Sequence, residues 1–139
     1  MSKVVVKYIC LWGLLVLPEL SFALVNENVC SKFHVGKFSY EGSFGEIIFM
    51  RSKTEEINYR VYPTSYIRTS IKWVSPCTME QKVMEVHDEI FPLQKVSKMI
   101  ASKSTLYLTE VFSDGYSFKL VDSSGVTTGR VKIYTKPLK

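Results

Sequence analysis

The side chains with the most chemistry to offer are two histidines and the acidic residues beside one of them. In an extended segment, His87 and Glu89 lie on the same face, an arrangement that holds a cation or polarises a water molecule. His34 is far away in the chain, and neither H-x-x-x-H nor H-E-x-x-H spacing occurs. A solvated strand end explains the cluster more simply, so the sequence predicts no metal ion and no cofactor.

Motifs for covalent catalysis and phosphate binding are missing from the sequence as well. It contains neither G-x-S-x-G nor S-x-x-K, and its serines lie mainly in turns. Glu55 and Glu56 are adjacent, so on a strand they point in opposite directions and cannot act as a glycosidase pair. Gly42 and Gly45 suit a hairpin turn better than a phosphate loop. We therefore expect a binding protein and not an enzyme.

The amino terminus has the layout of an export signal. Two lysines precede an apolar run over 8–17, and Ser21 and Ala23 place small residues where a signal peptidase cleaves. The run is about half the roughly 20 residues that a membrane-spanning helix needs. We expect residues 1–23 to be a signal peptide and 24–139 to be one mature domain, secreted or periplasmic after cleavage.

Removal of the signal leaves two cysteines, Cys30 and Cys77, in an oxidising compartment. An even pair without the C-x-x-C redox spacing indicates a disulfide bond, with free thiols or a redox pair as the alternative. The chain-entropy model gives a loop of this size a stabilisation of about 4 kcal/mol. A small exported domain gains from such a bridge because its core is limited.

The charge of the mature chain argues against nucleic acid as a partner. Residues 24–139 keep 16 Lys and Arg residues against 12 Asp and Glu residues, a net charge of +4. The cations are scattered, as at Arg60, Lys82 and Lys119, whereas a nucleic-acid binder gathers them on one face. We expect a solvated surface, no nucleic-acid partner and no stable membrane span in the mature chain.

Alternation of apolar and polar residues predicts strands along the mature chain. Within 54–62, Ile57 and Tyr59 alternate with Glu56 and Asn58, so one face is expected to be buried and the other wet. Proline and glycine separate the alternating runs. Eight strands are predicted, over 33–40, 46–51, 54–62, 66–74, 77–86, 105–112, 116–121 and 126–135.

Short links between successive strands favour an all-β fold. The turns at 113–115 and 122–125 end in glycine, which suits hairpins. Strands joined in this way predict an antiparallel up-and-down meander that closes into a small barrel and so removes exposed edges. A β-sandwich is the alternative. Residues 92–100 have apolar residues at helical spacing and predict one short helix or a covering loop.

The apolar residues of these strands are expected to face the inside of the barrel. The expected inner cluster consists of Ile57, Tyr59, Ile67, Ile71, Trp73, Phe118 and Ile133. Five strand aromatics are candidates for the lining of an apolar ligand pocket, namely Tyr59, Trp73, Tyr107, Tyr116 and Phe118. In the alternative, these rings fill the core, because small barrels are packed by their own side chains.

Two segments resemble a known group of proteins. One is 30–40, C-S-K-F-H-V-G-K-F-S-Y, and the other is 71–79, which holds Trp73 and Cys77. Together they resemble small exported bacterial β-proteins of unassigned function, which carry C-x-K-F-x-x-G-x-F-x-Y and a downstream W-x-x-x-C. The resemblance implies a disulfide-linked β-meander and no known activity.

More distantly, the start of the domain is similar to the lipocalin-like barrels, which open with G-x-W on the first strand. Gly36 and Phe38 occupy the matching positions, with phenylalanine in place of tryptophan. The mature chain is also short for a lipocalin. The resemblance implies a small barrel, while both departures argue against a spacious ligand cavity.

These observations predict an exported, non-catalytic, disulfide-linked binding protein. The first expectation is a lipocalin-like barrel that holds a small apolar ligand. The alternative is a protein-interaction module of the cell envelope, an adaptor or inhibitor with a filled barrel, whose partner is an envelope protein. Lysozyme is disfavoured as the target of such an inhibitor, because a basic chain repels a cationic enzyme.

Overall fold

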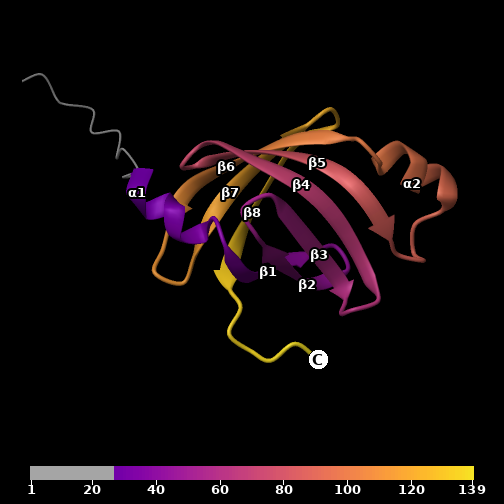
Figure 1. Ribbon diagram of the computed structural model, residues 1–139, viewed down its shortest axis with the longest axis horizontal. Coiled ribbons are helices and arrows are strands. Elements are labelled where there is room, and N and C mark those ends of the chain that lie inside the picture. The colour runs from indigo at the N-terminus through magenta and orange to yellow at the C-terminus, as the bar shows by residue number, and fades with distance from the viewer. Residues whose placement is uncertain (1–26) are drawn as a thin grey trace, which may run out of the picture.

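The computed structural model describes residues 27–139, which form a closed antiparallel β-barrel (Figure 1). Each strand pairs with its neighbours in the chain, and the last strand returns to the first, so the predicted eight-stranded up-and-down fold is confirmed. The strands are β1 (Gly36–Gly42), β2 (Gly45–Arg51), β3 (Glu55–Val61), β4 (Ser65–Ser75), β5 (Thr78–His87), β6 (Lys103–Val111), β7 (Gly115–Asp122) and β8 (Gly125–Ile133). The predicted signal peptide lies outside the described residues.

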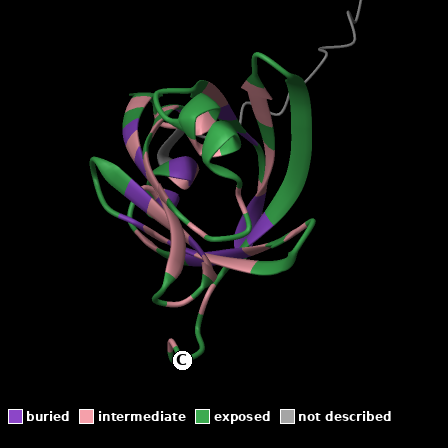
Figure 2. Cartoon of the chain, turned by 90° about the vertical axis from the view of Figure 1, so that its right-hand side faces the viewer, coloured by how far each residue is buried: buried purple, intermediate pink, exposed green. Residues whose placement is uncertain are grey.

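Successive turns lie at alternate ends of the barrel, which makes the two ends different. The turns after β2, β4 and β6 share one end with the short helices α1 (Glu27–Cys30) and η1 (Ser31–Phe33), and we call it the closed end. The turns after β1, β3 and β7 share the other end with α2 (Leu93–Met99), and we call it the mouth. Figure 2 views the barrel from the α2 side.

Side chains fill the half of the barrel next to the closed end. Phe33 of η1 is fully buried, and its ring centroid lies 5.1 Å from that of Tyr116 and 6.2 Å from that of Phe38. The buried cluster comprises Cys30, Phe33, Phe38, Phe49, Ile71, Met79, Leu106, Leu108, Tyr116 and Val131. Removing this apolar surface from water is the main stabilising contribution to the fold.

The first strand starts later than the sequence predicted. Residue 33 was expected to open a strand, but η1 carries Phe33 across the closed end and β1 begins at Gly36. The predicted disulfide between Cys30 and Cys77 is confirmed, with the two Cα atoms 5.3 Å apart. This bridge ties α1 and η1 to the turn after β4, so the chain must cross the end of the barrel before it joins the sheet.

The predicted short element over 92–100 is the helix α2. Pro92 lies immediately before it, where a missing N–H costs nothing, and the backbone N–H of Ile100 donates to the Val96 carbonyl at 3.0 Å. No residue of α2 is buried, and Leu93 is 85% exposed. The helix therefore rests at the mouth with little packing against the barrel.

Strand β3 turns a polar face inward, contrary to the expectation for Ile57 and Tyr59. Glu56 pairs with Arg51 across β2 and β3, and both residues are only 4% exposed. Residues directly opposite each other share a face of the sheet, and neighbours along a strand alternate. Ile57 and Tyr59 therefore lie on the outer face. Tyr59 is nonetheless buried there, at 9% exposure, and its ring centroid lies 4.9 Å from that of Tyr62.

Ile67 and Ile71 of the expected inner cluster do face the inside of the barrel, whereas Ile133 is partly exposed. Ile71 is buried at 7% exposure and packs in the core. Ile67 lies on the same face of β4 and lines the interior. Ile133, the last residue of β8, lies opposite Phe38 and is 43% exposed.

The barrel closes through a short seam between β1 and β8. Only two residue pairs are in register there, Phe38 with Ile133 and Ser39 with Lys132. By contrast, β7 and β8 are paired over their whole shared length. On the mouth side of the seam a surface cleft separates the strands, lined by Ser39, Tyr40, Glu41, Glu46, Arg130 and Lys132.

Candidate functional site

The half of the barrel next to the mouth contains a cavity with two chambers. The deep chamber has a volume of about 260 Å³, and the outer chamber has a volume of about 370 Å³. The outer chamber reaches Phe44 in the turn after β1 and Phe91 ahead of α2, so it opens at the mouth. The chambers adjoin, because both are lined by Tyr40, Asn58, Ile67, Phe118 and Thr127.

The deep chamber has one apolar wall and one polar wall. Strands β6 to β8 supply the apolar wall, with Leu106, Phe118, Leu120 and Val131. The Phe118 ring lies over Gly129, where a Cβ atom would come within 2.9 Å of it. Strands β3 to β5 supply the polar wall, which we call the polar stripe; it consists of Glu56, Asn58, Thr69 and Gln81.

A buried ion pair lines the deep chamber on the side of the closed end. Arg51, the last residue of β2, donates from Nε to Glu56 Oε2 at 2.7 Å. Its Nη1 donates to the Phe33 carbonyl at 2.9 Å, and its Nη2 donates to the Tyr116 hydroxyl at 3.0 Å. Each guanidinium nitrogen thus has a partner, which is the condition under which a buried ion pair is tolerated.

Aromatic rings surround this guanidinium group. Its central carbon lies 5.1–5.8 Å from the ring centroids of Phe38, Phe49, Trp73 and Tyr116. Burial lowers the pKa of Arg51, but attraction to Glu56 and Tyr116 outweighs it and holds the pKa above its ordinary value. Burial also raises the pKa of Tyr116 to about 12. The group is therefore one permanent cation enclosed with its carboxylate.

The polar stripe presents hydrogen-bonding groups to the cavity. Asn58 Nδ2 donates to Glu56 Oε1 at 3.0 Å, and Ser104 Oγ donates to Gln81 Oε1 at 3.2 Å. Tyr40 reaches the same cavity from β1. Burial, and secondly the charge of Glu56, raises the pKa of Tyr40 to about 12, so its hydroxyl stays neutral.

A second ion pair joins two elements of the mouth. Arg60, near the end of β3, donates two hydrogen bonds to Asp88, which follows β5, and both are 2.7 Å long. The Asp88 side chain is 3% exposed, and it also accepts the backbone N–H of Ile90 at 3.2 Å. Hydrogen bonds from Arg60 hold the pKa of Asp88 below its ordinary value. The pair fixes the segment that leads to α2 against β3.

The structure brings two of the five predicted pocket residues to the cavity. Phe118 lines both chambers, and the fully buried Tyr116 lines the deep chamber. Trp73 faces inward but packs against the core near the closed end. Tyr59 and Tyr107 lie on the outer face, and Tyr107 is 40% exposed. Tyr107 stands between two buried leucines of β6, so strand alternation turns it outward.

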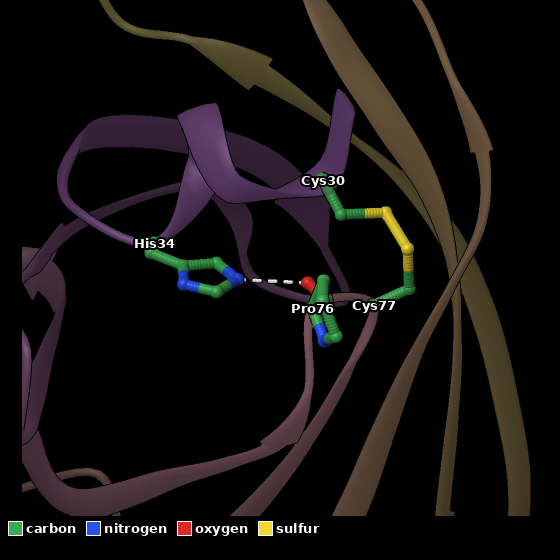
Figure 3. The surroundings of a disulfide bond; sticks show 4 residues. All are labelled: Cys30, His34, Pro76 and Cys77. Atoms are coloured by element: carbon green, nitrogen blue, oxygen red, sulfur yellow. Dashed lines mark hydrogen bonds between the residues drawn. A yellow bond between two sulfur atoms is a disulfide. The ribbon is translucent and has the colours of Figure 1, made fainter. Parts of the chain in front are cut away.

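Trp73 supports the end of the barrel that holds the disulfide, where His34 and Pro76 lie beside the Cys30–Cys77 bridge (Figure 3). Its ring stacks on His34 with the centroids 3.7 Å apart, and His34 Nε2 donates to the Pro76 carbonyl at 2.7 Å. Pro76 directly precedes Cys77 of the bridge. His34 thus holds the turn after β4, and its role in the described structure is a packing and hydrogen-bonding one.

The cluster around His87 does not converge on a site. The imidazole Nδ1 donates to the Thr64 carbonyl at 2.8 Å, and the ring stacks on Tyr66 with the centroids 5.3 Å apart. Asp88 turns away to Arg60. Within residues 27–139, no three His, Cys, Asp or Glu side chains are placed to hold a metal ion.

Sequence reasoning missed most of the polar groups that shape the cavity. One signal was present for Arg51, which stands two residues after Phe49 and therefore on the same face of β2. A charge on a core face needs a buried partner, and Glu56 across the turn supplies it. No such signal marks Asn58 or Gln81, because polar residues that alternate along a strand ordinarily face water.

No protein-family model, curated protein or solved structure matches this chain. The resemblances to exported bacterial β-proteins and to lipocalin-like barrels therefore remain predictions. In the part of the chain that the structure describes, no helix is long and apolar enough to cross a membrane.

The ion pair at the mouth gives a pH-dependent prediction. Because the pKa of Asp88 is lowered in the folded state, the pair stabilises the fold at neutral pH. That contribution is lost as the pH falls below about 4, the ordinary range for aspartate, and then through the lowered folded-state value. Asp88→Asn is expected to be less stable than the wild type at neutral pH, with a gap that narrows in acid.

Urea denaturation of both proteins across this pH range measures the difference in their free energies of unfolding. Glu89→Gln is the matched control, since Glu89 is the exposed neighbour and Asp88 is the carboxylate that pairs with Arg60. A gap between wild type and Asp88→Asn that stays constant with pH contradicts the assignment.

Proposed function

We propose that the protein is an exported binding protein that holds a small, largely apolar molecule in the cavity behind the mouth of its barrel. The cavity itself carries the proposal. Its outer chamber alone, at about 370 Å³, reaches the range of about 300–1,000 Å³ that small-molecule sites occupy. An apolar wall with a few convergent polar groups is the usual composition of such sites.

The packing of the barrel supports the same role. The closed end is filled by aromatic rings and tied by the Cys30–Cys77 bridge, so it provides a rigid base for a cavity that opens at the other end. A disulfide also fits an oxidising compartment, which agrees with the export signal expected over residues 1–23. We therefore place the protein outside the cytoplasm, secreted or periplasmic.

A second candidate is the protein-interaction module of the cell envelope. Exposed apolar side chains at the mouth favour it, with Phe44 68% exposed and Leu93 85% exposed. Large exposed apolar patches mark contact surfaces in other proteins. The cavity argues for the first candidate, because the alternative expected a filled barrel.

Uptake of an apolar fluorescent probe tests the proposal. The wild type is expected to bind the probe saturably. Ile67→Trp, which enlarges a side chain lining both chambers, is expected to weaken binding about tenfold, or about 1.4 kcal/mol, because its indole ring occupies cavity volume that the probe needs. Tyr107→Trp adds the same ring on the outer face and is expected to leave binding unchanged.

Circular dichroism establishes that each variant is folded. If Ile67→Trp does not fold, Thr127→Trp places the same block from β8 at an exposed position that also lines both chambers. A wild type that takes up no probe, or one whose uptake survives both blocking variants, overturns the proposal. The interaction module then becomes the better account.

A further inference from the structure

The two walls of the deep chamber differ in chemistry, although Ile67 interrupts the polar wall and Thr127 lies on the apolar one. Strands β6 to β8 present hydrocarbon and aromatic surface, whereas β3 to β5 present the polar stripe. A purely apolar occupant would cover the stripe without satisfying it, which costs free energy for every polar group taken from water. A molecule that fits both walls has an apolar body and hydrogen-bonding groups along one side.

The stripe has donors and acceptors to offer such a molecule. Gln81 accepts from Ser104 through Oε1, and within residues 27–139 its amide N–H groups have no protein partner. Asn58 uses one N–H on Glu56, and its Oδ1 is likewise without a partner in the described chain. The Thr69 hydroxyl lies between them on β4. These are neutral groups that suit a hydroxyl, carbonyl or amide.

The charges beside the chamber are already committed to each other. Arg51 and Glu56 are 2.7 Å apart, with side chains that are 1% and 6% exposed. Arg51 lines the chamber, but its Nη1 and Nη2 donate to the Phe33 carbonyl and the Tyr116 hydroxyl, so each of its nitrogens already has a protein partner. An anionic ligand would lie next to the Glu56 carboxylate, and the Arg51 cation that lines the chamber is already paired with that carboxylate, so the charge of the ligand would be costly to bury.

We propose that the deep chamber selects an uncharged amphipathic molecule, one with an apolar body and a hydroxyl, carbonyl or amide group bound by Gln81, Asn58 and Thr69. This inference rests on the proposed function and adds the chemical class of the ligand. The apolar body packs against Phe118 and Leu120 on the facing wall.

Three probes of equal chain length test it, a primary alkanol, the corresponding alkanoic acid and the corresponding alkane. Each competes with the apolar fluorescent probe for the full-length exported protein. The alkanol is expected to bind about threefold to tenfold more tightly than the alkane, the size of one net hydrogen bond. The acid is expected to compete only when protonated, so its affinity falls as the pH rises through the pKa of its carboxyl group.

Gln81→Met tests whether Gln81 causes the preference for the alkanol over the alkane, because methionine keeps the length of the side chain and removes its amide. This variant is expected to bind the alkanol no more tightly than the alkane, while its affinity for the alkane stays the same as that of the wild type. Lys82→Met is the matched control, since Lys82 is the exposed neighbour on the outer face of β5, and both affinities are expected to stay unchanged. Thr69→Val is the second variant if Gln81→Met does not fold.

The outcomes separate this inference from the function on which it rests. Equal affinity for alkanol and alkane, or tightest binding by the ionised acid, overturns the selection of an uncharged polar group and leaves the cavity as a binding site. Failure of all three compounds and of the fluorescent probe overturns the proposed function itself. Loss of the alkanol preference in Gln81→Met alone supports the inference.

Discussion

Replacing Arg51 with methionine is expected to lower the free energy of unfolding by about 3–5 kcal/mol. The substitution keeps most of the apolar stem but leaves the Glu56 carboxylate buried without its cation. The Phe33 carbonyl and the Tyr116 hydroxyl lose their donor at the same time. Urea denaturation followed by circular dichroism measures the change without relying on the fluorescence of Trp73, which lies close to the substitution.

The double variant Arg51→Met with Glu56→Leu provides the control. It removes both charges, and replacing a buried ion pair by apolar groups is often neutral or stabilising, so much of the lost stability is expected to return. If the single variant costs less than about 1 kcal/mol, the pair does not hold the base of the cavity. If the double variant is no better than the single one, the loss comes from packing and not from an unpaired carboxylate.

Removing the disulfide by Cys30→Ala with Cys77→Ala is expected to cost about 2–5 kcal/mol. The bridge reduces the number of conformations open to the unfolded chain, because it joins residues 47 positions apart, and this favours the folded state. It also anchors η1, from which Phe33 enters the core and offers its carbonyl to Arg51. Cys30 itself is fully buried, so its truncation removes packing as well.

The wild type treated with reductant in denaturant serves as the comparison, since it loses the bridge and keeps both sulfur atoms. Its stability is expected to approach that of the double variant. Labelling of the unreduced, unfolded wild type is expected to find no free thiol at Cys30 or Cys77. Two labels at these positions, or an unchanged urea midpoint in the double variant, contradicts the stabilising role of the bridge.

Much of the fold was predictable because it follows from local pattern. Alternation with a period of two, together with turns such as 122–125, indicated the strands and their sequential pairing. Alternation reports that two faces differ, but it does not say which face is inside. On β3 the more polar face is the inner one, because Glu56 must meet Arg51, and Tyr59 finds its apolar partners in Tyr62 and Tyr66 outside.

The candidate site was less predictable because its key groups are conspicuous only after the strands are paired. Phe118 and Tyr116 were identified as lining residues since aromatic side chains in strands ordinarily face a core. Gln81 and Asn58 look like solvent-facing residues in the sequence, and their shared wall exists only through the register of β3, β4 and β5. The division of the barrel into a filled half and a hollow half likewise depends on how η1 crosses the closed end.

The seam between β1 and β8, which has two residue pairs, is the part of the barrel that we expect to open first. It joins the first and last strands of the described chain, so its contacts carry the largest loss of chain entropy and return the fewest backbone hydrogen bonds. Amide protons on the seam side of β8 are therefore expected to exchange with solvent faster than those shared by β4 and β5, which pair at nine positions. We therefore expect the barrel to open along this seam before any hairpin is lost, and such an opening would give a lateral route to the cavity beside Tyr40.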